Sequence, residues 1–264
     1  MSKWRLTVKK SIIFFDVDGT LYDNENKTIP KEVVSALKKL AEHPEYELAL
    51  ATGRSISSLN IIEEILPLFR IQVLINGSYV IDGKNVVQKY ALEKNVVARV
   101  VEYLQKNNVL FGLIGSDGHV ISNDHPEWKH VFSLFGIEVP RIDPDYHQEN
   151  EIYQLWIFGN NDKINIFSKE FPEVRFVSWP HDGMDVIHKT SSKGESIRIL
   201  KETYNWDQII AIGDGLNDLE MFQLADIKVA MGQSHEELKK HATFVTDSVD
   251  KNGLVKALMR LNLL

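Results

Sequence analysis

The sequence contains no cysteine. This absence excludes disulfide bonds, catalysis by a thiolate and metal sites with sulfur ligands. A metal ion could therefore bind only to carboxylate, carbonyl or imidazole groups. The nine histidines show no spacing typical of a metal site, so we expect most of them to be surface or core residues.

Long apolar runs and an excess of positive charge are also missing. No stretch approaches the length of a membrane span, and the apolar run after the basic N-terminus is too short for a signal peptide. The chain has 30 Lys and Arg against 37 Asp and Glu, a net charge of −7, whereas nucleic-acid binding requires a basic face. We expect a cytoplasmic protein that binds neither nucleic acid nor membranes. We further expect a monomer or a weak homodimer.

Apolar segments alternate with amphipathic segments in the first and last thirds of the chain. Strands are predicted at 12–15, 47–52, 72–76, 208–214, 227–231 and 243–246. Helices are predicted at 30–43, 55–69, 193–204, 217–225 and 253–261. Nearly continuous apolar strands between amphipathic helices indicate a parallel sheet covered on both faces. The predicted fold is therefore α/β, with a Rossmann-like, doubly wound parallel sheet as its core.

The middle of the chain has a different pattern, with longer and more polar strands. Turns typical of hairpins occur at 81–87, 115–120 and 179–186. We interpret residues 80–185 as a second α/β domain, inserted into a core that is formed by residues 1–79 and 186–264.

Polar residues follow several of the predicted core strands. Asp16 and Asp18 come directly after the first strand, and the carboxyl ends of parallel strands meet at one edge of a sheet. The other candidates at such ends or at a helix start are Thr52, Gly53, Arg54, Lys193, Asp214, Asn217 and Asp218. Clustered carboxylates repel each other and require a cation, and ligand sets made only of oxygen suit Mg²⁺. A lysine and a threonine hydroxyl are typical of a phosphate site, so the pattern favours phosphoryl transfer.

Other binding and catalytic motifs that share residues with these segments do not fit the sequence. A calcium loop starting at Asp16 would need glycine and glutamate where Leu21 and Lys27 stand. The run "GDGLND" has Asp218 in place of the last glycine of a dinucleotide fingerprint, and its acids would repel a diphosphate. Neither a GxxxxGK[ST] loop nor a GxSxG motif is present.

Four segments resemble, in order, the four motifs of the haloacid dehalogenase-like hydrolases. They are "DVDGTL" (16–21), "ATGR" (51–54), "SSKGESI" (191–197) and "IGDGLNDLEM" (212–221). The chain is most similar to the Cof-type sugar-phosphatase branch with a C2B-type cap, and "INGSYVIDGK" and "VAMGQS" also resemble it. Gln233 and Ser234 differ from the asparagine and alanine common there, at positions that we interpret as structural. The resemblance spans the whole chain and implies that residues 80–185 form a cap that closes over the substrate.

The resemblance implies a role for each acid. Asp16 would be the nucleophile that forms an aspartyl-phosphate, and Asp18 would be the general acid and base. Asp214 would bind Mg²⁺ together with the Asp16 carboxylate and the backbone carbonyl of Asp18. Gly19 would allow the sharp turn after the two acids, and the Thr20 hydroxyl could hold that turn.

The remaining motif residues would bind the substrate. Thr52 and Lys193 would hold phosphoryl oxygens. Asn217 and Asp218 would bind phosphate or orient Lys193 and metal-bound water, and Asp218 could contact the metal directly or through water. Gly53 and Arg54 would lie near the phosphate end. In the cap, Trp156, Trp179, His181 and Asp182 are candidates for contact with the leaving group, although packing of Trp179 in the cap core is the favoured interpretation.

The predicted function is a Mg²⁺-dependent phosphatase for small phosphomonoesters. Its partner would be a small phosphorylated metabolite, such as a sugar phosphate, FMN or pyridoxal phosphate. A sugar phosphomutase is the alternative. A sensor of phosphorylated metabolites is less favoured, because the chain keeps all four of Asp16, Asp18, Lys193 and Asp214.

Overall fold

The computed structural model describes residues 11–264 except 117, 135, 137, 159–166, 168 and 180–182. These residues divide into two compact units. The first comprises the chain up to Ala51, Ile62–Gln72 and Gly194–Leu264, and the second comprises Thr52–Ile61 and Val73–Lys193.

A parallel sheet forms the centre of the first unit. Its strand order is β13-β12-β11-β1-β2, followed by β3. The strands are β1 (Ser11–Phe15), β2 (Tyr46–Ala51), β11 (Gln208–Gly213), β12 (Ile227–Ala230), β13 (Phe244–Val245) and β3 (Ile71–Leu74), of which only the first two residues belong to this unit. The pairs from β13 to β2 are all parallel, and every residue of the central strand β1 is buried. The predicted doubly wound parallel sheet is therefore confirmed.

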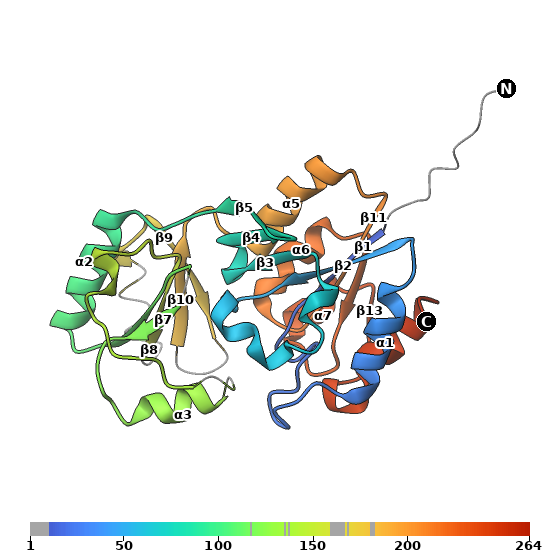
Figure 1. Cartoon of the computed structure of the whole chain (residues 1–264), viewed down its shortest axis with the longest axis horizontal. Helices are drawn as coiled ribbons and strands as arrows, with labels where there is room; N and C mark the ends of the chain where they lie inside the picture. The colour runs from blue at the N-terminus through green and yellow to red at the C-terminus, as the bar shows by residue number, and fades with distance from the viewer. Residues whose placement is uncertain are drawn as a thin grey trace. The chain divides into compact units, whose positions relative to one another are not determined.

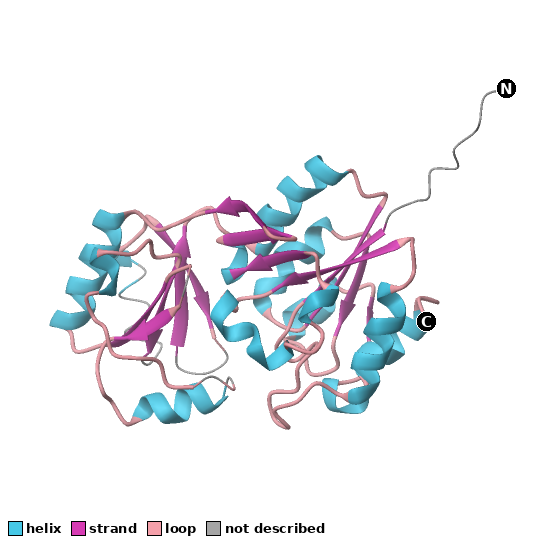
Figure 2. Ribbon diagram, viewed as in Figure 1, coloured by secondary structure: helices cyan, strands magenta, loops and turns pink. Residues whose placement is uncertain are grey.

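Helices cover both faces of this sheet (Figure 2). The helices are α1 (Lys31–Ala41), α5 (Lys193–Tyr204), α6 (Leu219–Leu224), α7 (Glu236–His241) and α8 (Gly253–Arg260). In α1, Val33, Leu37 and Leu40 recur at helical spacing and are buried, which is why this segment folds as an amphipathic helix. Helix α1 contacts α8, and α6 contacts α7.

The helix predicted at 55–69 is wrong. The structure has two short 3₁₀ helices there, Ile56–Ile62 and Leu66–Leu68. The serine hydroxyls at the start of the segment bond to one another, and the Arg54 side chain donates to the carbonyl of Ser58 over 3.1 Å. Such side-chain bonds compete with the bonds of an α-helix, and Pro67 removes one donor.

The second unit is built mainly from antiparallel strands, accompanied by helices (Figure 1). Strands β4 (Tyr79–Asp82) and β5 (Asn85–Lys89) form a hairpin. A five-stranded sheet has the order β7-β6-β8-β10-β9. Its strands are β6 (Leu110–Ile114), β7 (His119–Ile121), β8 (Gln154–Phe158), β9 (Val174–Ser178) and β10 (Gly183–His188). Its helices include α2 (Lys94–Lys106) and α3 (Glu127–Leu134).

The three predicted hairpin turns are found between antiparallel strands. They connect β4 to β5, β6 to β7 and β9 to β10, although residue 117 of the second turn and residues 180–182 of the last one lie outside the described residues. The apolar face of α2 packs on this sheet in a core that includes Val97, Val100 and Leu104. The predicted α/β character of the middle of the chain follows from this arrangement.

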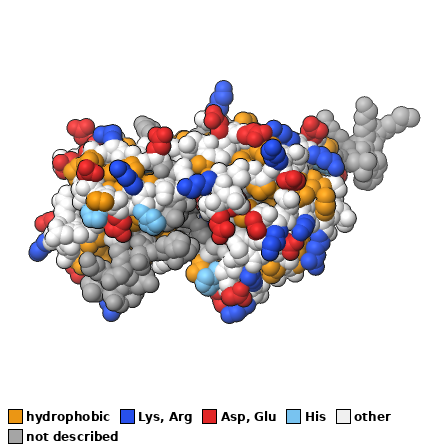
Figure 3. Space-filling view, turned by 90° about the horizontal axis from the view of Figure 1, so that it is seen from below, with side chains coloured by type: hydrophobic (Ala, Val, Ile, Leu, Met, Phe, Trp, Pro, Cys, Tyr) orange, Lys and Arg blue, Asp and Glu red, His pale blue; other side chains and the backbone are white. Residues whose placement is uncertain are grey.

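The compact units do not have the same boundaries as the predicted core and cap. Residues 52–61, 73–79 and 186–193 belong to the second unit. The domain boundaries at 80 and 185 stay a prediction. None of the described helices is long and apolar enough to cross a membrane. On the face in Figure 3, acidic and basic side chains are interspersed, without a large patch of one sign.

Candidate active site

The position of Asp16 is fixed by strand β1, which ends at the preceding residue. Strand β1 lies between β2 and β11, and the Asp16 N–H continues the ladder by donating to the carbonyl of Ile212 over 3.0 Å. Only 6% of Asp16 is exposed. A carboxylate at this depth requires compensation by donors or a cation.

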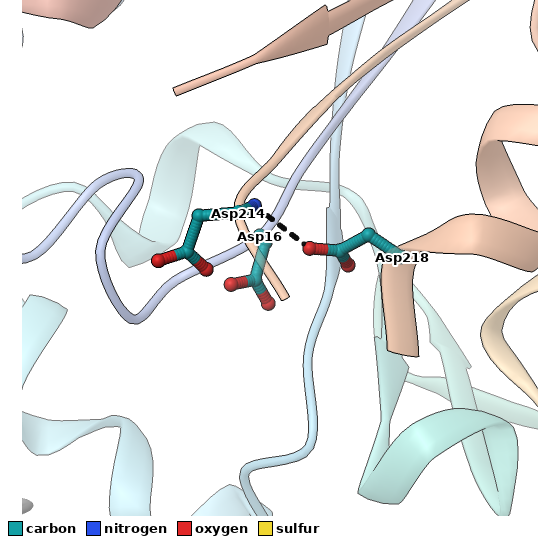
Figure 4. A group of neighbouring side chains, drawn as sticks. All are labelled: Asp16, Asp214 and Asp218. Atoms are coloured by element: carbon teal, nitrogen blue, oxygen red, sulfur yellow. Dashed lines mark hydrogen bonds between the residues drawn. The ribbon is translucent and has the colours of Figure 1, made fainter. Parts of the chain in front are cut away.

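Three carboxylates meet at the carboxyl ends of β1 and β11. One oxygen each of Asp16, Asp214 and Asp218 lies within 4.8 Å of the other two (Figure 4). Like charges at this separation repel each other strongly, and a divalent cation relieves the repulsion. Carboxylate oxygens without nitrogen or sulfur ligands suit a hard cation such as Mg²⁺. The donor set therefore fits the predicted metal.

Asp218 also holds the loop that carries Asp214. Its Oδ2 accepts hydrogen bonds from the N–H groups of Asp214 and Gly215, each at 2.9 Å. Asp218 is fully buried. One oxygen of Asp218 is thus occupied by the backbone, which makes the side chain a brace for this loop as well as a member of the cluster.

Gly19 brings the loop after β1 against Asp214. Its φ of +70° lies in the left-handed region, and a Cβ atom there would lie 2.0 Å from the Asp214 Oδ2. The turn is held by backbone bonds, because Leu21 and Tyr22 each donate to the carbonyl of Val17 over 2.9 Å. The expectation that the Thr20 hydroxyl holds this turn is wrong, since its buried Oγ1 has no hydrogen-bond partner.

The predicted phosphate-binding segment, Thr52–Arg54, belongs to the second unit. Thr52 and Arg54 are 1% and 7% exposed. The Thr52 N–H donates to the carbonyl of Val73 over 2.9 Å, and the Thr52 hydroxyl accepts from the Arg54 N–H over 3.1 Å. The segment after β2 is therefore a rigid, buried turn.

The other predicted residues differ in burial. Lys193 begins α5 and is 1% exposed, which is rare for a lysine without a polar or anionic partner. Asp18 and Asn217 are half-buried, and Asp18 does not belong to the cluster of three carboxylates. The cluster is made of side-chain oxygens, whereas Asp18 was predicted to bind the metal through its backbone carbonyl. This assignment therefore stays a prediction.

Comparison with known proteins identifies the family. The haloacid dehalogenase-like hydrolases match residues 13–258. The chain belongs to this family.

Relatives that match over nearly the whole length support the enzyme class. The Bacillus subtilis protein YkrA, provisionally named a phosphatase, is 32% identical over 96% of this chain and 98% of its own. YwtE of the same organism, a 5-amino-6-(5-phospho-D-ribitylamino)uracil phosphatase, is 26% identical over 92% of this chain and 94% of its own. The solved sugar phosphatase BT4131, of haloacid dehalogenase subclass IIB, is 25% identical with a TM-score of 0.88, over 97% of this chain and all of its own. The expected class, a hydrolase acting on phosphoric monoesters, is confirmed.

Gln233 is a site residue that the sequence interpretation missed. In this haloacid dehalogenase-like hydrolase, its Nε2 donates to the carbonyl of Gly19 and, over 3.3 Å, to the Asp214 Oδ2. Its Oε1 accepts from the N–H of Val249 over 3.2 Å. The only sequence signal was the departure from the family's asparagine, which we interpreted as structural. The longer amide side chain links the loop after β1 to the Asp214 carboxylate.

The cap candidates can be placed only in part. Trp156 is 8% exposed, and its ring packs edge-on against Phe132 at 5.4 Å between centroids. The half-buried Trp179 packs its ring against Phe158 at 5.0 Å between centroids, and its place in the cap core stays a prediction. His181 and Asp182 lie outside the described residues.

Proposed function

We propose that the chain is a Mg²⁺-dependent phosphatase for small phosphomonoesters, with sugar phosphates as the main substrates and Asp16 as the nucleophile. The observation that carries the proposal is the cluster of Asp16, Asp214 and Asp218 within 4.8 Å at the ends of β1 and β11. A buried nucleophile beside two further acids needs a cation to approach a phosphate dianion. Family membership supports the same chemistry.

The proposed reaction has two steps. First, an Asp16 carboxylate oxygen attacks phosphorus, the bond from phosphorus to the ester oxygen breaks, and Asp18 gives its proton to the leaving alkoxide. In the second step, Asp18 takes a proton from water, the water oxygen attacks phosphorus, and the bond to Asp16 breaks to release inorganic phosphate. When bound, Mg²⁺ would supply charge neutralisation at the phosphoryl oxygens. Its proposed ligands are the carboxylates of Asp16 and Asp214 and the backbone carbonyl of Asp18.

The substrate-binding residues complete the proposal. Thr52 and Lys193 would hold phosphoryl oxygens, and Asn217 would support them. Gly53, which has no side chain, would allow the turn to pack closely. Arg54 would lie toward the phosphate end. The preference for sugar phosphates is supported by the subclass IIB sugar phosphatase. The relative that acts on a ribitylaminouracil phosphate makes larger phosphorylated metabolites, such as FMN, a necessary part of the substrate panel.

The test is phosphate release from a panel of sugar phosphates, FMN and pyridoxal phosphate, with Mg²⁺ and then with EDTA. We expect release that requires the metal and that Asp16→Asn abolishes. The exposed Asp207→Asn is a matched control, since it removes the same charge just before β11. Conversion of a sugar phosphate into its isomer without free phosphate would instead support a mutase. Binding without any product would support a sensor.

A further inference from the structure

Another buried carboxylate lies in the second unit and has no part in the proposed reaction. Asp185 on β10 is 5% exposed. Its Oδ2 accepts from the Asn76 side-chain amide over 3.0 Å. Its Oδ1 accepts from the Gln154 amide over 2.6 Å and from the Trp179 indole N–H over 2.9 Å. Three donors at this depth make Asp185 a built hydrogen-bonding centre rather than an incidental surface acid.

Asn76, the donor to Oδ2, belongs to a strained turn. Ile75, Asn76 and Gly77 have φ values of +52°, +50° and +90° in succession. A β-branched residue in the left-handed region is unfavourable and persists only where its surroundings enforce it. The bond from Asn76 to Asp185 is one such restraint, because it anchors the middle residue of the turn to β10.

This turn in turn holds the predicted phosphate-binding segment. The N–H of Ile75 donates to the carbonyl of Arg54, and the N–H of Asn76 donates to the carbonyl of Thr52, each over 3.0 Å. Gly53 provides the space between them, since a Cβ atom there would lie 3.2 Å from the Asn76 Nδ2. A change at the Asn76 side chain is therefore transmitted directly to Thr52–Arg54.

We propose that Asp185 is a positioning residue that acts through Asn76 to hold Thr52–Arg54 in the geometry that binds the phosphoryl group. The role toward phosphate rests on the proposed function, whereas the chain of contacts lies within the second unit. Asp185 touches neither substrate nor metal in this proposal. Its contribution is to fix a strained turn that otherwise relaxes.

Protonation of Asp185 provides a specific readout. Burial raises the pKa of the Asp185 carboxyl to about 7, although the bonds from Trp179, Asn76 and Gln154 lower it. Among the described residues, the groups that hydrogen-bond to the Asp185 carboxylate from the end of β9, from the turn after β3 and from β8 are these three neutral donors. A proton on Oδ2 would point at the Asn76 amide, which is also a donor, so Asn76 must turn or lose its bond. The positioning is thus complete with the carboxylate and weakened when the acid is neutral.

The test compares KM and kcat with pH in the wild type, Asp185→Asn and Asn76→Gly. Glycine at position 76 keeps the left-handed backbone and removes the side-chain bond to Asp185. For both variants we expect KM for the best substrate to rise about tenfold at pH 8, the effect of losing one hydrogen bond to a charged group. The wild-type KM should rise below pH 7, whereas KM of Asp185→Asn should lack that inflection.

Gln154→Met is the matched control. It removes one donor to the Oδ1 of Asp185 and leaves the bond to Asn76 in place. Losing a bond that lowers the pKa should shift the inflection to higher pH, with KM at high pH unchanged. A role limited to stability predicts lower stability in all three variants and unchanged KM profiles. Such profiles in folded Asp185→Asn and Asn76→Gly would overturn the proposal.

A second readout does not depend on activity. Amide hydrogen exchange at Ile75 and Asn76 reports the bonds that these N–H groups make to the segment 52–54. We expect faster exchange in Asp185→Asn than in the wild type at pH 8, after correction for the intrinsic rate. Equal protection would overturn the proposal. A wild type without phosphatase activity but with this difference would overturn the proposed function and leave the mechanical link in place.

Discussion

The first unit gathers three carboxylates, Asp16, Asp214 and Asp218, within 4.8 Å of one another, whereas the second surrounds the single carboxylate of Asp185 with three neutral N–H donors. The two arrangements stabilise buried acids in opposite ways. The repulsion within a cluster of acids is relieved by a cation, which binds to the cluster and can also interact with a ligand. Such an arrangement suits catalysis. An acid compensated by fixed donors is locked in place, which suits the support of a neighbouring turn.

Among the substitutions that distinguish the two arrangements, Asp16→Asn is expected to have the largest effect. Loss of the nucleophile should lower the rate of phosphate release by about 10³-fold or more, because the asparagine amide cannot attack phosphorus as the carboxylate does. The free energy of unfolding should stay the same or rise, since one of three repelling charges is removed. Steady-state rates and thermal unfolding of purified Asp16→Asn check both expectations. Wild-type turnover would remove Asp16 from the chemistry.

Gly19→Ala tests how tightly the cluster is packed. The new Cβ atom would lie 2.0 Å from the Asp214 Oδ2. Displacement of one carboxylate should weaken activation by Mg²⁺ about a hundredfold, an effect comparable with the loss of supporting groups at metal sites. The measurement is the Mg²⁺ concentration for half-maximal activity.

Gly83→Ala is the matched control for this substitution. Gly83 has a similar φ of +61° in the turn between β4 and β5, and a Cβ atom there meets nothing within 4 Å. Both variants should lose about 1 kcal/mol of stability from the left-handed backbone. Only Gly19→Ala should change the response to Mg²⁺. Equal responses would show that the cluster tolerates the displacement.

A smaller effect is expected for Gln233→Ala. Removing the amide that contacts the Gly19 carbonyl and the Asp214 carboxylate should weaken activation by Mg²⁺ about tenfold, with little change in kcat at saturating metal. The exposed Gln148, which donates to Asp145, offers a comparison variant, Gln148→Ala. If both glutamine variants respond to Mg²⁺ as the wild type does, Gln233 has no part in the site.

A further effect concerns the dependence of the free energy of unfolding on pH, through Asp185 in the second unit. The folded pKa of Asp185, about 7, lies above its ordinary value of 3.8, so the folded protein binds this proton more tightly than the unfolded chain. Its contribution to stability is complete below about pH 4 and is lost as pH rises to 7. Relative to Asp185→Asn, the free energy of unfolding of the wild type should fall by about 1 kcal/mol for each unit by which pH rises across that window. Chemical denaturation at pH 5, 6 and 8 measures the difference. A constant difference would contradict the raised pKa.

The site in the first unit could be predicted from the sequence because its signals are local. Asp16 stands directly after an apolar strand, and Asp214 follows another, so the rule for parallel sheets brings them together. The prediction of an α-helix at 55–69 was wrong. Hydrogen bonds among the serine hydroxyls, and the bond from the Arg54 side chain, outweigh the helical spacing of the apolar residues there.

The support around Asp185 could not be predicted in this way. Its partners Asn76 and Gln154 lie 109 and 31 residues away along the chain, and only the folded strands bring them together. Gln233 likewise meets Gly19 across 214 residues. A motif identifies residues that carry chemistry, whereas the side chains that position them depend on tertiary contacts that no local pattern records.

The central claim is that Asp16 forms a covalent phosphoryl intermediate, and a rapid-quench experiment tests it most directly. The enzyme is mixed with substrate and Mg²⁺, quenched within the first turnover, and the peptide that contains Asp16 is analysed by mass spectrometry. The account predicts a phosphoryl group on Asp16 that requires Mg²⁺ and is absent from Asp16→Asn. Phosphate release at full rate with no phosphoryl group on the chain at any quench time would contradict it.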